Sequence, residues 1–85
     1  MKTKELEVNG TKYMVKEPTV GLLFPLMKLM ETDPQAFQLE LAKAVIHVNG
    51  KPIGDGLMEV GMSDYLKLIN EVVGVSGLGD SSPNA

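Results

Sequence analysis

The residues that could carry out chemistry are few, and their spacing does not predict an active site. His47 is the only histidine of the 85-residue chain, and there is no cysteine. A catalytic histidine works with a nucleophile or an orienting partner, whereas a single histidine on the polar side of an expected helix is typical of a solvated residue. Ser63 is expected to cap a helix. We therefore expect no enzyme activity, no catalytic residue, no cofactor and no metal site.

Two glycine-containing segments resemble phosphate-binding loops only in composition. Residues 74–79 follow an expected helix, whereas a dinucleotide-binding motif follows a strand and opens a helix. Residues 49–51 lack the spacing and the following Ser or Thr of a P-loop. Both segments are expected to stop helices. The carboxylates Glu40, Asp64 and Glu71 are expected on solvent-facing sides next to lysines, which is ordinary surface patterning.

The charge composition argues against nucleic-acid binding, and the length of the apolar run argues against a membrane-spanning segment. The net charge is −3, and the eight basic residues are all lysines, with no arginine to read bases or phosphates. The apolar run over residues 20–30 is shorter than the ~20 residues that span a bilayer, and it contains Pro25. Residues 1–5 lack the apolar core of a signal peptide. We expect a cytoplasmic protein, and the absence of disulfides fits that compartment.

The first local structure that the sequence predicts is a β-hairpin. Asn9-Gly10 supplies the positive φ angles of a type I′ turn, and apolar and polar residues alternate on both sides of it. Leu6, Val8, Tyr13 and Val15 fall on one face. Because a hairpin alone is marginally stable in water, this face must rest on other elements.

The first helix is expected over residues 20–31, with Thr19 as its N-cap. Pro25 complicates this prediction, because a proline inside a helix removes one hydrogen bond and clashes with the preceding turn. Two alternatives remain open: a kinked helix over the whole segment, or a short turn at 20–23 followed by a helix that has Pro25 in its first turn. We favour a helical segment with a bend at residues 22–25.

This helix is apolar nearly all the way round, whereas a surface helix carries one apolar stripe. Between Val20 and Met30 only Lys28 is charged. We interpret the helix as the segment on which the other elements pack, with apolar surface left over for a partner. The candidate partner-binding residues are Leu22, Leu23, Leu26, Met27 and Met30. The alternative, that the hairpin and the other helices cover the helix fully, stays open.

Two further helices follow. Asp33-Pro34 predicts the start of an amphipathic helix that runs to His47 and stops at Asn49-Gly50. Residues 51–61 are expected to form a loop, and Ser63 is expected to cap the third helix. The predicted core consists of the apolar residues that share faces of these elements: Leu6, Val8, Tyr13, Val15, Phe37, Leu41, Val45, Leu66, Ile69 and Val73.

Together these elements predict an α+β fold, with an N-terminal β-hairpin packed on about three short α-helices. The chain length allows one small domain. We expect this domain to cover residues 1–76. Residues 77–85 are rich in Gly, Ser, Asp and Pro and are expected to form a flexible C-terminal tail.

The order of these features resembles the small tail assembly chaperones of long-tailed bacteriophages, which are encoded before the tape-measure gene. The resemblance covers roughly residues 4–75 and is carried by "VNGTKYMVKEPTV", by the apolar helix after it, and by "SDYLKLINEVVG" in the last helix. Family members often have charged residues just after the E-P-T-V element. This chain instead has the uncharged sequence Gly-Leu-Leu-Phe-Pro at residues 21–25.

The resemblance implies a non-enzymatic role. Such chaperones bind the tape-measure protein, keep it soluble, help to recruit tail-tube subunits and leave before the tail is finished. Many exist in a short form and a frameshifted long form. Self-association is also expected. The alternative functions are a small structural tail or virion component that oligomerises through its apolar first helix, and a regulatory binder of a host enzyme.

The tail prediction is testable by truncation. Beyond Leu78 the tail has no large apolar side chain to anchor it. Deleting residues 79–85 should therefore leave the thermal midpoint within about 2 °C of the full chain, measured by circular dichroism. A drop of several degrees would contradict the prediction, because it would mean that these residues dock on the fold.

Overall fold

The computed structural model describes residues 2–76, and it begins with the expected hairpin. Strands β1 (Thr3–Val8) and β2 (Thr11–Lys16) pair antiparallel, with Leu6 opposite Tyr13. Asn9 and Gly10 form the turn with φ values of 51° and 82°. Because opposite residues share a face, this register confirms the predicted apolar face. Val8, Tyr13 and Val15 are buried there and Leu6 is half-buried.

The described residues extend the hairpin into a four-stranded sheet of order β1-β2-β3-β4. Strand β3 (Ile46–Val48) pairs with β2, and β4 (Lys51–Pro52) pairs with β3. The prediction of a helix up to His47 is therefore wrong by two residues. The β-branched residues Val45, Ile46 and Val48 precede an Asn-Gly pair, which is the sequence pattern of a hairpin. Asn49 and Gly50 have φ values of 56° and 80°, so they form this turn and do not end a helix.

Three α-helices and one short 3-10 helix complete the described fold. They are α1 (Val20–Thr32), α2 (Pro34–Val45), η1 (Gly54–Glu59) and α3 (Met62–Ser76). The predicted cap of α2 is confirmed, because an Asp33 side-chain oxygen accepts a hydrogen bond from Ala36 N at 3.1 Å. The α+β class is also confirmed.

Three predictions about the second half of the chain are wrong. Residues 51–61 contain β4 and η1 and are not simply a loop, because Leu57 is buried and anchors η1 on the core. Ser63 is not a cap, since it lies inside α3, which starts at Met62. The helix also continues through Gly74 to Ser76, because burial of Val75 outweighs the weak helix propensity of one glycine. The predicted tail, residues 77–85, lies outside the described residues.

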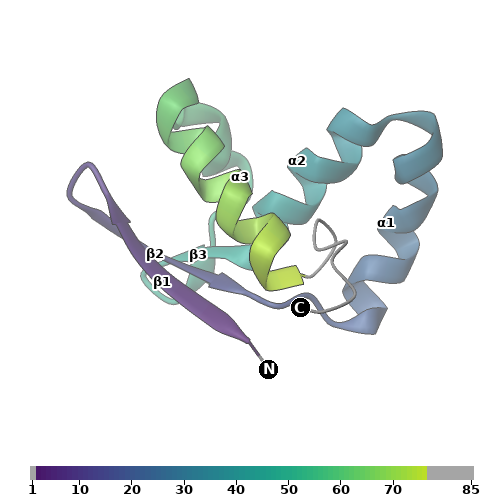
Figure 1. Cartoon of the computed structure of the whole chain (residues 1–85), viewed down its shortest axis with the longest axis horizontal. Coiled ribbons are helices and arrows are strands. Elements are labelled where there is room, and N and C mark those ends of the chain that lie inside the picture. The colour runs from purple at the N-terminus through teal and green to yellow at the C-terminus, as the bar shows by residue number, and fades with distance from the viewer. Residues whose placement is uncertain (1, 77–85) are drawn as a thin grey trace.

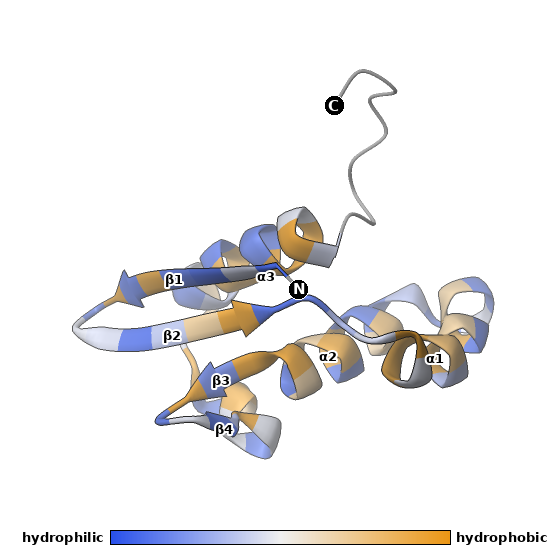
Figure 2. Cartoon of the chain, turned by 90° about the horizontal axis from the view of Figure 1, so that it is seen from below, coloured by the Kyte–Doolittle hydropathy of each residue, from blue (hydrophilic) through white to orange (hydrophobic). Residues whose placement is uncertain are grey.

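Helix α3 packs across the inner face of the hairpin, and α2 lies between α3 and α1 (Figures 1 and 2). Two polar contacts fix the outer parts of this arrangement. The Asn9 side-chain amide donates a hydrogen bond of 2.5 Å to the Asp64 carboxylate, which joins the hairpin turn to α3. Lys43 on α2 lies 3.3 Å from Asp55 on η1. The hydrogen bond to Asp55 is the main cause that raises the pKa of Lys43.

The core is formed by α2, α3, the inner face of the sheet and Leu57 of η1. Its buried apolar residues are Val8, Tyr13, Val15, Phe37, Leu41, Ala42, Val45, Ile46, Leu57, Leu68, Ile69, Val72 and Val75. The predicted core residue Leu66 is instead 60% exposed, and Val73 is only half-buried. The reason is the rotation of α3, which turns Leu68 and Val72 inward and leaves Leu66 on the outer side.

Helix α1 is not the segment on which the other elements pack, and that interpretation is wrong. None of the 13 described residues of α1 is buried. Its main contacts are with α2, and Figure 1 shows it at the edge of the molecule. Figure 2 shows many apolar residues along α1, at the end away from the β1–β2 turn. The central helix is α2, which is 12 residues long and has four buried side chains.

The core assignment predicts a contrast between two leucines. Leu41 is 2% exposed, so Leu41→Ala should lower the free energy of unfolding by about 2–5 kcal/mol. Leu66→Ala is the matched control and should change it by about 0.5 kcal/mol or less. Urea denaturation of both variants measures the difference. Equal losses would contradict the assigned rotation of α3.

Candidate functional site

The segment before α1 positions the helix against the sheet. Glu17 N donates a hydrogen bond to Lys2 O at 2.8 Å, and Lys2 N donates to Glu17 Oε1 at 3.0 Å. Thr19 then caps α1, because its side-chain oxygen accepts a hydrogen bond of 3.2 Å from Leu22 N. This cap confirms the predicted start of the helix.

Pro25 lies inside α1 and does not end it. The helix runs as one element from Val20 to Thr32, so the alternative of a separate turn at residues 20–23 is wrong. Pro25 is the sixth residue of the helix, and the one hydrogen bond that it cannot donate would go to the carbonyl of Gly21. Gly21 is exposed, so water can satisfy this carbonyl. Asp33 N closes the other end by donating to Leu29 O at 2.7 Å.

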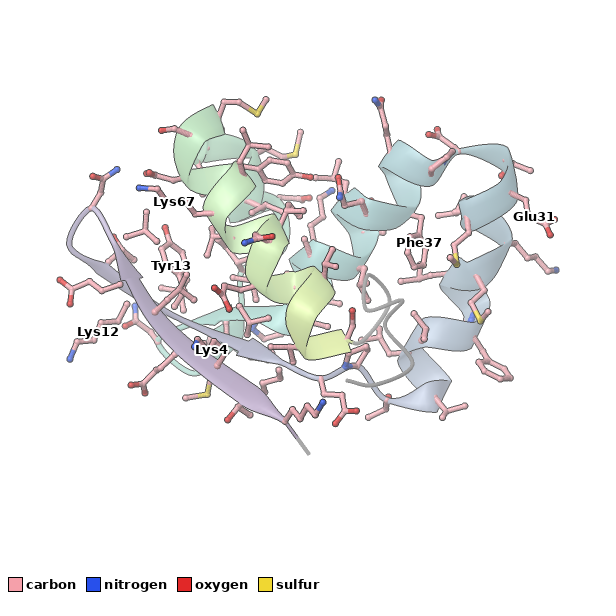
Figure 3. All side chains as sticks on the ribbon, in the orientation of Figure 1. Lys4, Lys12, Tyr13, Glu31, Phe37 and Lys67 are labelled. Carbon is pink, nitrogen blue, oxygen red and sulfur yellow. The ribbon has the colours of Figure 1, made fainter. Side chains whose placement is uncertain are left out.

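One side of α1 packs on the rest of the protein. Leu22, Leu23, Leu26 and Leu29 are half-buried and pack against the core cluster. Phe37 on α2 lies in the space between α2 and α1 (Figure 3). These four leucines attach α1 to the domain.

The opposite side of α1 exposes a second set of large apolar side chains. Val20, Phe24 and Met27 follow the i, i+4, i+7 spacing of one helix face, and their exposed fractions are 67%, 64% and 42%. Met30 is 40% exposed as well, although its i+4 spacing from Leu26 and i+7 spacing from Leu23 put it at the edge of the leucine side. We call Val20, Phe24, Met27 and Met30 the outer stripe of α1. Glu31 continues this face at i+4 from Met27, Lys28 is exposed beside it, and Figure 3 shows Glu31 at the outer edge of the helix.

The structure divides the five candidate partner-binding residues between these two sides. Met27 and Met30 lie on the outer stripe, whereas Leu22, Leu23 and Leu26 lie on the packed side. The sequence analysis missed Val20 and Phe24, which are the most exposed apolar residues of α1. Their spacing with Met27 is visible in the sequence, but the ring of apolar residues gives no sign of which face the domain covers.

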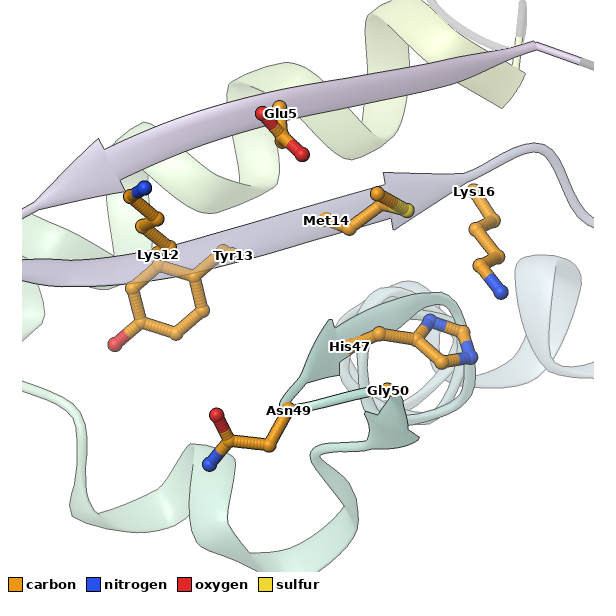
Figure 4. Close-up of a pocket in the computed structure, with 8 residues that line it drawn as sticks. All are labelled: Glu5, Lys12, Tyr13, Met14, Lys16, His47, Asn49 and Gly50. Atoms are coloured by element: carbon orange, nitrogen blue, oxygen red, sulfur yellow. The ribbon is translucent and has the colours of Figure 1, made fainter.

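The residues considered for chemistry are not brought together. His47 lies on β3 and is half-buried, so its predicted position on an exposed helix face is wrong; its Nδ1 is 2.9 Å from Val45 O. It borders a hollow of about 260 Å³ on the outer face of the sheet with Lys12, Lys16 and Glu5 (Figure 4). Within residues 2–76, histidine and carboxylate side chains form no group of three that could hold a metal ion.

Comparisons with protein-family models, with curated proteins and with solved structures give no match for this chain. In the described part of the chain, the helices are too short or too polar to cross a membrane. The described surface carries several exposed large apolar side chains. They are the outer stripe of α1 and, elsewhere, Met58, Met62 and Leu66.

The two sides of α1 should differ in their effect on stability. Leu26→Ala removes a half-buried contact with the core and should lower the free energy of unfolding by about 1–3 kcal/mol. Phe24→Ala removes an exposed side chain, and we expect a change of about 0.5 kcal/mol or less. Thermal and urea denaturation of both variants, at a concentration where each is monomeric, provide the measurement. A larger loss for Phe24→Ala would show that the outer stripe packs within the domain.

Proposed function

We propose that this chain is a non-enzymatic tail assembly chaperone that binds the phage tape-measure protein through the outer stripe of α1. The observation that carries the binding part of this proposal is the exposure of four large apolar side chains on one helix. The tape-measure protein is proposed as the partner because the hairpin and last-helix sequences resemble those of tail assembly chaperones. In this proposal the protein acts in the cytoplasm of the host cell, keeps the tape-measure protein soluble and helps to recruit tail-tube subunits.

The chemistry of the outer stripe favours an apolar, helical partner segment. Full burial of one such side chain contributes roughly 1.5–3 kcal/mol, so an interface that covers Phe24 and its neighbours gains several of these contributions. Anchors at i, i+4 and i+7 are the spacing with which helices recognise one another. Met27 and Met30 add flexible thioether side chains, which adapt to different apolar sequences along a long partner.

The size of the stripe suits a protein that must be released. Four side chains on a 13-residue helix form a surface much smaller than the roughly 800 Å² per partner of a stable complex. Binding is therefore expected to be weak at each site and strong only where many copies coat one partner. The net charge of −3 favours the solubility of unbound copies.

The alternative function is a small structural tail component that oligomerises through the same helix. The apolar character of the outer stripe fits this function as well, because apolar faces pack on copies of themselves. Mass spectrometry of purified particles distinguishes the two, since a chaperone is absent from finished tails and a structural component is present.

A charge placed on the outer stripe should abolish capture of the partner. Phe24→Glu and Met27→Glu should leave the circular dichroism spectrum unchanged, because both positions are exposed, and should abolish pull-down of a co-expressed tape-measure fragment. The burial of an unpaired carboxylate at the interface is the physical reason. Leu26→Glu, on the packed side, should instead destabilise the fold.

Thr32→Glu is the matched control, because it adds the same charge to an exposed position of α1 away from the stripe. This variant should capture the fragment as wild type does. Capture by Phe24→Glu and Met27→Glu at wild-type level would contradict the proposed site.

A further inference from the structure

Strand β1 is the longer of the two outer strands of the described sheet. In the order β1-β2-β3-β4, β1 and β4 lie at the two ends, and Figure 2 shows them on opposite sides of the sheet. Strand β4 has two residues, one of them a proline without an N–H group, so it offers little backbone for pairing. Strand β1 has six residues and, among the described residues, pairs with β2 alone. Its other edge is a surface on which a further strand can pair.

The pairing of the hairpin determines which residues of β1 turn their backbone groups to this free edge. Glu17 N donates a hydrogen bond to Lys2 O, so these two residues form a hydrogen-bonded pair. Antiparallel pairs alternate between those that exchange backbone hydrogen bonds and those that do not. Every second residue from Lys2 to Val8 therefore bonds to β2. The residues between them, which direct their N–H and C=O groups away from β2, are Thr3, Glu5 and Glu7. We call these three the edge residues.

Two of the edge residues are carboxylates that lie on one face. Glu5 and Glu7 are exposed, and their two-residue spacing puts both side chains on the outer face of the sheet. The ion pairs within residues 2–76 are made by Lys43, so neither Glu5 nor Glu7 is paired in this part of the chain. Leu6 lies between them and is half-buried. A hollow of about 160 Å³ beside the strand is lined by Glu5, Leu6, Glu7 and Lys12.

The charges of β1 disfavour its pairing with β1 of a second copy. In such an antiparallel pair, the edge residues of one copy must lie opposite those of the other copy. The register centred on Leu6 places Glu5 opposite Glu7, and the registers centred on Glu5 and on Glu7 place each of these residues opposite itself. The register centred on Lys4 places two lysines opposite each other. Like charges directly opposite destabilise strand pairs, so all four registers are unfavourable.

We propose that β1 binds an extended segment of a partner protein that has basic side chains at two alternate positions and an apolar side chain between them. The segment adds to the sheet as a further antiparallel strand, as the described strands already pair. Its two Lys or Arg residues lie opposite Glu5 and Glu7, and its apolar residue lies opposite Leu6. The charge pattern that rejects a second copy accepts this segment.

Backbone pairing supplies the affinity of this site, and the side chains supply its specificity. Each of the three edge residues offers one N–H and one C=O group to the new strand. Opposite charges directly across a strand pair are favourable. The residue opposite Leu6 belongs to a pair without hydrogen bonds, in which side chains approach most closely, so an apolar side chain fits there. The interface is small, and binding is therefore weak and reversible.

This site goes beyond the proposed function, because it lies on the sheet and does not involve α1. Figure 1 shows β1 and α1 on different sides of the molecule. One chain can therefore hold an apolar helix at α1 and an extended basic segment at β1.

The test follows amide hydrogen exchange in the full chain by NMR, with the capped peptide Thr-Val-Lys-Val-Lys-Val-Thr as the probe. In the free protein, the amides of Glu5 and Glu7 should exchange fast. A peptide concentration on the order of 1 mM should slow both at least about twofold, which corresponds to half occupancy. The amide of Gln35, in the first turn of α2, has no partner within the helix and should keep its rate.

Two matched controls separate strand pairing from general charge attraction. The peptide Thr-Lys-Val-Val-Lys-Val-Thr has the same composition but places its lysines on opposite faces of a strand, so it should bind at least about threefold more weakly. The double variant Glu5→Gln with Glu7→Gln should weaken binding of the probe by a similar factor. Glu31→Gln with Glu59→Gln removes two charges from exposed positions outside β1 and should bind the probe as wild type does.

No slowing of exchange at this peptide concentration, equal binding of the two peptides, or equal weakening by the two double variants would each overturn the proposal. Slow exchange of Glu5 and Glu7 without peptide would also overturn it, because the chain itself would cover its edge. If that protection grows with protein concentration, a second copy is the occupant. Phe24→Glu should bind the probe as wild type does, so failure of the proposed function leaves this site standing.

Discussion

The packing of α2 between the sheet and the other two helices is the constraint on which the rest of this structure depends. Phe37, Leu41 and Val45 are buried along one side of α2, and Ile46 begins β3 with no loop after the helix. Because helix and strand are continuous, the direction of α2 and the register of β3 on β2 cannot vary independently. The position of α3 follows, since it fills the angle between α2 and the hairpin. The space left for α1 is then only the far side of α2.

This peripheral position explains why an apolar helix remains partly uncovered. The four leucines on its inner side are enough to attach α1 to α2, but no described element lies over Val20, Phe24 and Met27. Exposed apolar patches promote aggregation, so their presence on a free surface is unfavourable. Their position on a helix that is capped at both ends supports the proposal that the outer stripe is an interface.

The sequence allowed the local features to be predicted, and it failed where tertiary packing decides. The hairpin, the Thr19 and Asp33 caps and most core positions follow from turn chemistry and periodicity. The end of α2 was missed because residues 45–48 suit either a buried helix or a strand, and only pairing with β2 selects the strand. Val20 and Phe24 were missed for a related reason. A helix that is apolar on all sides does not indicate which side its own domain will cover.

The most direct test of this account is the accessibility of the methyl groups of α1 in the monomer. Relaxation of labelled methyl groups by a soluble paramagnetic agent, measured by NMR at low protein concentration, reports this accessibility residue by residue. The account predicts strong relaxation for Val20 and Met27, weak relaxation for Leu41 and Val45, and loss of the strong effect when a tape-measure fragment is added. Equal protection of Val20, Met27 and Leu41 in the free monomer would contradict it, because the outer stripe would then be part of the core.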